Sequence, residues 1–110
     1  MPSIAAQRSF LNQTAGFGAT TIFTPTVAGE FVIGMFLEGD ATNGGPLQAG
    51  YSYTNDNGPS GDNTGSFNGS KGQRSLLQYF HAVAGQPIQV NVPSFSGTAS
   101  YNLFVTLISL

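Results

Sequence analysis

The sequence predicts an all-β fold, a sandwich or barrel of about seven to eight short antiparallel strands. Two observations lead to this prediction. Apolar and polar residues alternate along several short segments instead of recurring at helical spacing. Fifteen glycines and six prolines separate these segments, as expected for turns between strands. With 110 residues, the chain is long enough for one domain with one hydrophobic core, and too short for two.

The first half of the chain contains four predicted strands. Residues 1–7 are expected to form an extended N-terminal arm, followed by short strands over Arg8–Gln13 and Ala19–Pro25. The segment Glu30–Gly39, EFVIGMFLEG, is apolar on both faces, which indicates a strand inside a sandwich or at a subunit contact. Leu47–Thr54 alternates cleanly and predicts a half-buried strand.

The segment Asn55–Gln73 is predicted to be a long polar loop. It is rich in glycine, asparagine and serine, and Phe67 is its one large apolar residue. Loops of this length are usually functional or disordered. We expect this loop to reach a neighbouring subunit or the capsid through Phe67, and deletion of Asn57–Gly69 to weaken assembly without preventing folding.

Three further strands are predicted in the second half. Residues 74–85 have mixed spacing, and the turn that follows them favours a strand over a short helix. Residues 87–93, PIQVNVP, alternate throughout. The closing segment, Ala99–Leu110, is apolar on both faces. One face can fill the core, while the other, with Phe104, Ile108 and Leu110, needs cover that a symmetric neighbour would supply.

Charged residues make up only 7% of the chain, and the net charge is −2. Three cations do not make the basic surface of a nucleic-acid-binding protein. A charge-poor surface suits a subunit packed against neighbours, because buried charges must be paired or desolvated. The chain has no cysteine, and its start lacks the pattern of a secretory signal. No apolar stretch is long enough to span a bilayer as a helix, so we expect synthesis in a cytoplasm.

No catalytic or cofactor-binding pattern is found, and we expect no enzyme activity, cofactor or metal. His81 is the only histidine, and a structural role is favoured over a ligand or base because one side chain does not make a site. No serine lies in G-x-S-x-G. The acidic residues have no spacing that suggests a glycosidase pair; they are Glu30, Glu38, Asp40, Asp56 and Asp62.

Two binding interpretations compete with simpler ones. Asp56 and Asp62 lie in a glycine-rich segment whose oxygen ligands would suit calcium, but the EF-hand pattern fails, and turn chemistry is favoured. Aromatic residues could form a sugar-stacking platform, but aromatics that alternate along strands more often belong to the core. These residues are Tyr51, Tyr53, Phe67, Tyr79 and Phe80.

Several stretches, taken in order, resemble small jelly-roll virion proteins of tailed bacteriophages. They are TPTVAGEFVIGMFLEG, LQAGYSYTNDNG, HAVAGQPIQVNV and GTASYNLFVTLISL, and together they extend over about Phe23–Leu110. The resemblance lies in a strand start of the form P-x-x-G-x-Y/F, a strand and turn V-x-Y-T-D-x-x-G, an AGTPI turn and a final Y-N-L-x-V-x-L strand. The segment Asn55–Gln73 is longer than the turn expected there.

The resemblance implies a structural virion protein, most closely a capsid decoration (cement) protein on the outer capsid surface. Such proteins are usually trimers that clamp adjacent copies of the major capsid protein, and no catalytic residues are implied. The residues expected at the oligomer or capsid contact are Phe67, Phe104, Ile108 and Leu110. Two alternatives remain: a carbohydrate- or host-recognition module of a phage fibre or tail, and a self-assembling filament subunit.

Overall fold

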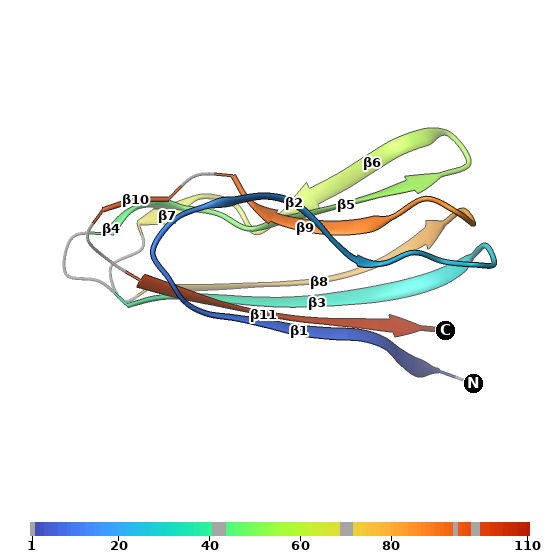
Figure 1. The fold of residues 1–110 in the computed structure, drawn as a ribbon, viewed down its shortest axis with the longest axis horizontal. Coiled ribbons are helices and arrows are strands. Elements are labelled where there is room, and N and C mark those ends of the chain that lie inside the picture. The colour runs from blue at the N-terminus through green and yellow to red at the C-terminus, as the bar shows by residue number, and fades with distance from the viewer. Residues whose placement is uncertain (1, 41–43, 69–71, 94, 98–99) are drawn as a thin grey trace.

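The computed structural model is a sandwich of two four-stranded antiparallel sheets, with a small three-stranded sheet at one end (Figure 1). It describes residues 2–40, 44–68, 72–93, 95–97 and 100–110. The strands are β1 (Ser3–Gln13), β2 (Phe17–Phe23), β3 (Gly29–Asp40), β4 (Gly44–Leu47), β5 (Gly50–Asn55), β6 (Gly58–Asn63), β7 (Phe67–Asn68), β8 (Gln73–Ala82), β9 (Ile88–Val92), β10 (Phe95–Gly97) and β11 (Ser100–Ser109). Within these ranges, no helix has the length and apolar character needed to cross a membrane.

The eight longer strands follow the path of one long hairpin wound into two sheets. β1 pairs with β11, β2 with β9, β3 with β8 and β5 with β6, all antiparallel. Pairing of β11 with β3 and of β5 with β9 closes the sheets. Sheet A is then β1-β11-β3-β8, and sheet B is β2-β9-β5-β6. This winding defines a jelly roll, and the predicted antiparallel sandwich is confirmed.

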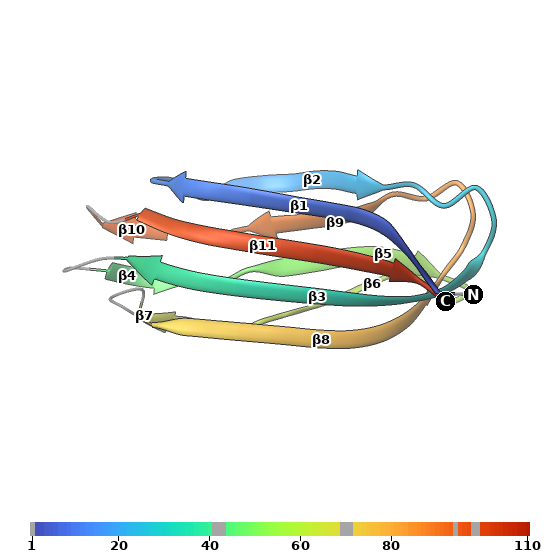
Figure 2. The same cartoon turned by 90° about the horizontal axis from the view of Figure 1, so that it is seen from below.

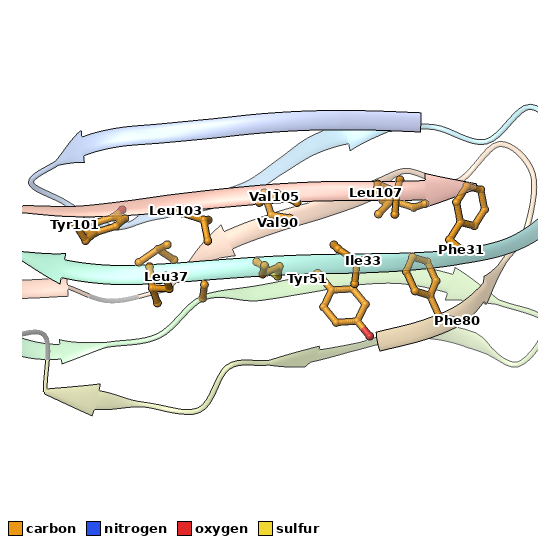
Figure 3. Packing of buried hydrophobic residues seen from close by; sticks show 14 of the residues in the cluster. Phe31, Ile33, Leu37, Tyr51, Phe80, Val90, Tyr101, Leu103, Val105 and Leu107 are labelled. Atoms are coloured by element: carbon orange, nitrogen blue, oxygen red, sulfur yellow. The ribbon is translucent and has the colours of Figure 1, made fainter. Parts of the chain in front are cut away.

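One hydrophobic core fills the space between sheets A and B (Figure 3). β3 contributes Phe31, Ile33, Met35 and Leu37, and β11 contributes Tyr101, Leu103, Val105 and Leu107, all at most 3% exposed. Every second residue of these strands points inward because side chains alternate between the faces of a sheet. Burying a large apolar side chain contributes roughly 1.5–3 kcal/mol, so these two strands supply much of the stabilisation.

The opposite sheet supplies the other half of the core. Ile88, Val90 and Val92 of β9 are buried, with Gln89 and Asn91 between them only partly so. Tyr51 of β5 meets Phe80 of β8, a strand of sheet A, at the β6–β8 side of the core, where their rings lie 5.5 Å apart. The alternation predicted for Glu30–Gly39, 87–93 and Ala99–Leu110 is therefore seen in β3, β9 and β11.

The expected N-terminal arm is instead the first part of a strand. β1 begins at Ser3, which pairs with Ser109, and Gln7 pairs with Thr106. The sequence SIAAQ lacks alternation, but the exposed edge of β11 offers unpaired backbone groups, and pairing satisfies both strands.

The long polar loop expected over Asn55–Gln73 is also corrected, because it contains two strands. A tight turn leads from β5 into β6, with Asn55 Oδ1 accepting a hydrogen bond from the Asn57 N–H at 2.8 Å. β6 has almost no apolar residues, so it is held by backbone pairing and by close contact. A Cβ at Gly61 would lie 2.4 Å from the Tyr51 carbonyl oxygen. Deleting this segment would remove a sheet strand, so the expectation of intact folding is withdrawn.

The three short strands form their own sheet at one end of the sandwich. Its order is β10-β4-β7, and Figure 2 shows it at the end opposite the two chain termini. β4 precedes β5, β7 precedes β8, and β10 precedes β11. The predicted strand Leu47–Thr54 is thus split between β4 and β5. The small sheet gathers the connections at this end and leaves the outer faces of sheets A and B uncovered by other described elements.

Candidate interaction surface

The outer face of sheet A is unusually apolar for a solvent-facing sheet surface. Residues directly opposite one another in an antiparallel pair share a face. One row across the sheet is therefore Ile4, Ile108, Val32 and Tyr79. Leu77 and Tyr79 of β8 are 77% and 65% exposed, and Ile4 is 63% exposed. We name this surface, which also includes Phe36 and Phe104, the apolar face.

A shallow hollow of about 310 Å³ lies near the centre of the apolar face. Its floor is at Gly34, which has no side chain, and a Cβ placed there would lie 3.8 Å from Leu77 Cδ1. Phe36 and Phe104 line one side, with ring centroids 6.2 Å apart. A hollow with aromatic walls on an exposed surface is the kind of place where a partner's side chain can be buried.

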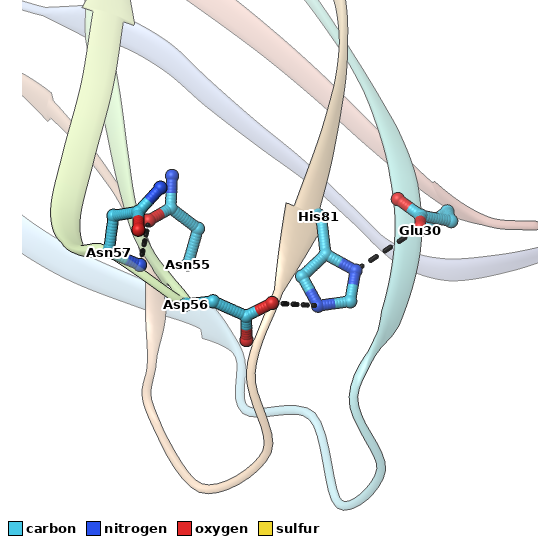
Figure 4. Close-up of polar contacts among 5 residues, drawn as sticks. All are labelled: Glu30, Asn55, Asp56, Asn57 and His81. Carbon is cyan, nitrogen blue, oxygen red and sulfur yellow. Dashed lines mark hydrogen bonds and ion pairs between the residues drawn. The ribbon is translucent and has the colours of Figure 1, made fainter.

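Both ends of the apolar face are marked by a carboxylate of β3. At one end, Glu30 Oε1 lies 3.2 Å from His81 Nδ1, and Figure 4 shows His81 between Glu30 and Asp56. His81 Nε2 lies 3.8 Å from Asp56 Oδ2. Since Asp56 belongs to the β5–β6 turn, this cluster connects the two sheets. Reduced hydration, followed by the Glu30 carboxylate, raises the pKa of Tyr79.

At the other end, Glu38 accepts a hydrogen bond from a neutral side chain. The donor is Asn102 Nδ2, 3.0 Å from Glu38 Oε1. Asn102 Oδ1 in turn accepts a hydrogen bond from the Asn12 N–H at 2.8 Å. Asn12 has a φ of 54°, a left-handed conformation that asparagine tolerates, and it lies where the register of β1 shifts. Asn102 thus links Glu38 of β3 to the end of β1 through its two side-chain hydrogen bonds.

The outer face of sheet B is polar. By register, Thr21, Gln89, Ser52 and Gly61 form one row across it. Gln89 Nε2 donates a hydrogen bond to Thr21 Oγ1 at 3.1 Å. A hollow of about 240 Å³ lies over Gly50. Its polar lining residues are Gln48, Ser52, Asp62, Asn63 and Asn91.

A polar network lies where β6 and β8 meet at the side of the sandwich. The Tyr51 hydroxyl is hydrogen-bonded to Gln78 Oε1, and Gln78 Nε2 donates to Asp62 Oδ2 at 2.7 Å. Burial raises the pKa of Tyr51 to about 12. The hydrogen bond from Gln78 lowers the pKa of Asp62. The network joins an edge strand of each sheet through neutral and charged hydrogen bonds.

Of the five aromatic residues considered as a sugar-stacking platform, the four with described side chains are not gathered on one surface. Tyr53 and Phe80 pack against each other with ring centroids 4.4 Å apart, and Tyr51 and Phe80 are buried. Tyr79 lies on the opposite side of β8, on the apolar face. Tyr51, Tyr53 and Phe80 therefore belong to the core or pack against it, as the simpler interpretation predicts, because large apolar rings are more stable when removed from water.

The calcium interpretation is likewise not supported by the geometry. Asp56 lies in the turn before β6, and Asp62 lies near the far end of that strand. Asp62 accepts hydrogen bonds from Gln78 and from the Asn63 N–H. Within the described ranges, no three His, Asp or Glu side chains are grouped so as to hold a metal ion.

Three of the four predicted contact residues have described side chains. Phe104 is 37% exposed on the apolar face, and Ile108 is half-buried between Ile4 and Val32 in register. Leu110 is 50% exposed, and its N–H donates to the Glu30 carbonyl oxygen at 3.0 Å. Phe67 pairs through its backbone with Leu47, but its side chain lies outside the described part of the chain.

Sequence reasoning missed the most exposed members of the apolar face, Leu77 and Tyr79. Each is followed or preceded by another large apolar residue, as in Leu76-Leu77 and Tyr79-Phe80, so alternation along β8 was obscured. The available signal was the pairing of β8 with β3: a strand apolar on both faces needs neighbours apolar on both faces.

Comparison with known proteins adds little. No protein-family model matches the sequence, and no curated protein matches it. Among solved structures, the chain is similar to one described as the structure of infectious bursal disease virus, Gx strain, with a TM-score of 0.39 and 15% identity. The match covers 99% of this chain and 36% of that chain. This chain therefore spans little more than a third of that protein's length, and a similarity this weak says nothing about what it does.

Proposed function

We propose that this chain is a structural protein of a virus particle. It acts as a decoration protein of a tailed bacteriophage, made in the host cytoplasm and bound to the outer surface of the capsid. The observation that supports this most is the apolar face, with Leu77 and Tyr79 exposed on an otherwise well-packed fold. Exposed apolar patches of this kind mark protein interaction sites. The ordered phage-like motifs and the jelly-roll topology agree with it.

The mechanism proposed is passive. A jelly roll with a rigid core presents one flat contact surface, and binding would bridge neighbouring copies of the major capsid protein. Separating those copies would then expose area buried by the bridge. A trimer of such subunits would bind at three points, so three weak contacts together would hold tightly.

The test is co-sedimentation with capsids assembled from the major capsid protein of the virus that encodes this chain. We expect the protein to sediment with the capsids and to raise the temperature at which they come apart. Light scattering behind a sizing column should give the mass of a trimer. Protein that stays in the supernatant at concentrations of about 10 μM, where even weak contacts register, would contradict the proposal.

A second candidate function is carbohydrate recognition, as in a host-recognition module. The polar hollow over Gly50 favours it, because side-chain amides, a hydroxyl and a carboxylate surround a space of about 240 Å³. Such groups hydrogen-bond to sugar hydroxyls. Binding to soluble sugars or host cells that is lost in Asn91→Ala, with capsid binding absent, would favour this function.

A further inference from the structure

β8 is an edge strand of sheet A that lacks most of the features that usually protect such edges. Edge strands expose unpaired backbone groups, and proteins commonly protect them with bulges, prolines, charges or short length. The edge strands β1 and β2 have register shifts, and β6 is six residues long and includes Pro59. β8 has ten residues without proline or glycine, its only Lys or Arg is Arg74 near its start, and its pairing with β3 is regular throughout. In Figure 2, β8 runs along the outer margin of the sandwich.

The hydrogen-bond pattern shows which backbone groups of β8 face the open edge. The Gly39 N–H donates to the Gly72 carbonyl oxygen at 2.9 Å, in register with the rest of β3 and β8. Hydrogen-bonded pairs alternate along an antiparallel ladder, so the even-numbered residues of β8 bond to β3. The N–H and C=O groups of Ser75, Leu77 and Tyr79 therefore point away from β3, toward the side where β8 has no strand neighbour in the described part of the chain.

The centre of β8 is symmetric in chemical type about one residue. The stretch Leu76-Leu77-Gln78-Tyr79-Phe80 has two large apolar residues on each side of Gln78. If two copies of β8 pair antiparallel with Gln78 opposite Gln78, Leu77 lies opposite Tyr79 on the outer face. On the inner face, Leu76 lies opposite Phe80. Apolar residues directly opposite one another stabilise a pair of strands, so this strand is complementary to itself on both faces.

The neighbouring registers lack this match. With the axis at Leu77, Tyr79 would lie opposite Ser75; with the axis at Tyr79, Leu77 would lie opposite His81. The register centred on Gln78 also agrees with the hydrogen-bond pattern, because Leu77 and Tyr79 both have backbone groups that face the open edge. Registers shifted by half a step would place outer-face residues opposite inner-face residues, which the pleat does not allow.

We propose that β8 pairs antiparallel with β8 of a second copy of this chain, about a two-fold axis at Gln78. The two copies of sheet A would then form one sheet of eight strands. The seven positions 75–81 would supply about four hydrogen-bonded pairs, each exchanging two backbone hydrogen bonds. Gln78 needs no partner at the axis, because its side chain is hydrogen-bonded to Tyr51 and Asp62 of its own subunit.

This contact goes beyond the proposed function and does not depend on it. It uses the edge of sheet A, so the apolar faces of the two copies would lie side by side as one larger surface. Where another contact makes a trimer, pairing of β8 would join subunits of neighbouring trimers.

The first experiment uses disulfide cross-linking, which is specific here because the chain has no cysteine. An equimolar mixture of Leu77→Cys and Tyr79→Cys is oxidised, after thermal melting has shown that each variant folds like wild type. Opposite residues of a hydrogen-bonded pair have Cα atoms about 5.5 Å apart, which a disulfide can bridge. The two copies of residue 77 would be about 8.5 Å apart, which is too far.

We expect the mixture to form a disulfide-linked dimer on a non-reducing gel, and each variant alone to stay largely unlinked. Val27→Cys mixed with Leu77→Cys is the control for chance collisions. Val27 lies in the β2–β3 turn and is as exposed as Leu77, 75% against 77%.

A second experiment leaves the chain without cysteine. Leu77→Pro removes an N–H that faces the open edge and no hydrogen bond to β3, whereas Leu77→Ala shortens the same side chain but keeps the N–H. Light scattering is measured at concentrations up to about 100 μM, where contacts of micromolar affinity are populated. The mass of wild type should at least double as concentration rises. Leu77→Ala should do the same at higher concentration, and the mass of Leu77→Pro should stay constant.

The outcomes separate this inference from the proposed function. If the Leu77→Cys and Tyr79→Cys mixture cross-links no faster than the Val27→Cys control, the β8 contact is overturned. If each variant links to itself as fast as the mixture links, the register at Gln78 is wrong and the inference is again overturned. A wild-type mass that does not change with concentration also contradicts it. The proposed function fails separately, if wild type does not sediment with capsids, because both experiments above use the free protein.

Discussion

The two outer faces of this sandwich are built by the same kind of strand and are opposite in chemistry. On its outer face, sheet A exposes Leu77, Tyr79 and Phe104 to solvent, whereas sheet B exposes Thr21 and Gln89. Both sheets bury an alternating apolar row against the shared core. The inward rows are therefore what folding requires, and the outward rows are free to differ. An outward apolar row adds nothing to the core, so its presence on one side only points to a contact made outside the chain.

The largest difference in the free energy of unfolding is expected between alanine variants of two neighbouring residues of β11. Leu103 is fully buried, so Leu103→Ala should lower the free energy of unfolding by about 2–5 kcal/mol. Phe104→Ala, on the apolar face, should lower the free energy of unfolding by about 1 kcal/mol or less, because the Phe104 ring mainly contacts Phe36. Urea unfolding of both variants measures this. Equal losses would mean that the apolar face is covered within the free subunit.

The next effect concerns the shape of sheet B. Gly61→Ala would place a Cβ 2.4 Å from the Tyr51 carbonyl oxygen, and the forced separation of β5 from β6 should cost about 1–3 kcal/mol. Gly18→Ala in β2 is the control, since nothing lies within 4 Å of the added Cβ. Thermal melting of the two variants should show a lowered midpoint for Gly61→Ala only. A normal midpoint would mean that β6 is loosely held.

Alkaline pH should test the core that both sheets share. Burial raises the pKa of Tyr51 and of Tyr101 to about 12 in the fold, while an unfolded tyrosine titrates near pH 10. Stability from these neutral phenols is thus fully present below pH 10 and is lost as the pH rises toward 12. We expect a fall of up to about 2.7 kcal/mol for each tyrosine across that window, because each pH unit is worth about 1.4 kcal/mol.

The control for this prediction is Tyr101→Phe, which cannot ionise. Its loss of the 2.6 Å hydrogen bond to the Ala15 carbonyl oxygen should lower stability at neutral pH by about 1 kcal/mol. Its further loss between pH 10 and 12 should be smaller than that of wild type. Identical pH profiles for the two proteins would show that Tyr101 is hydrated.

The smallest effect is expected on the outer face of sheet B. Gln89→Ala removes an exposed hydrogen bond to Thr21, and should change the free energy of unfolding by no more than about 0.5 kcal/mol. Urea unfolding measures it. A larger loss would mean that the polar face, like the core, contributes to folding, and the contrast between the inward and outward rows would no longer hold for sheet B.

The strands that the sequence predicts well are those whose side chains carry the pattern. β9 alternates Ile88, Val90 and Val92 with polar residues, and the strand predicted at 87–93 nearly coincides with the observed one. β6 has no alternating apolar pattern. Its residues are mostly glycine, serine, proline and aspartate, and the strand is held by backbone pairing with β5 instead of by its side chains. The sequence does not predict the start of β1 as a strand either. It too is held by backbone pairing, and its partner β11 lies about 100 residues away.

The candidate surface was predicted in part. Two-sided apolar character in the last strand pointed to Phe104 and Ile108, and both lie on or beside the exposed row. The exposed row on β8 was not foreseen, because exposure depends on which strand lies at the edge of the sheet. Pairing between strands far apart in the sequence decides which strand lies at the edge, and no local sequence pattern predicts this.

The wound hairpin also has a consequence for the order in which the chain folds. β5 and β6 are neighbours in sequence and can pair early, whereas β1 must wait for β11, which lies about 100 residues further along the chain. Topologies dominated by such distant pairs fold in milliseconds to seconds. We therefore expect refolding to proceed outward from the β5–β6 turn. β1 would be the last of the described strands to dock, and until then the edge of β11 would stay open to other chains.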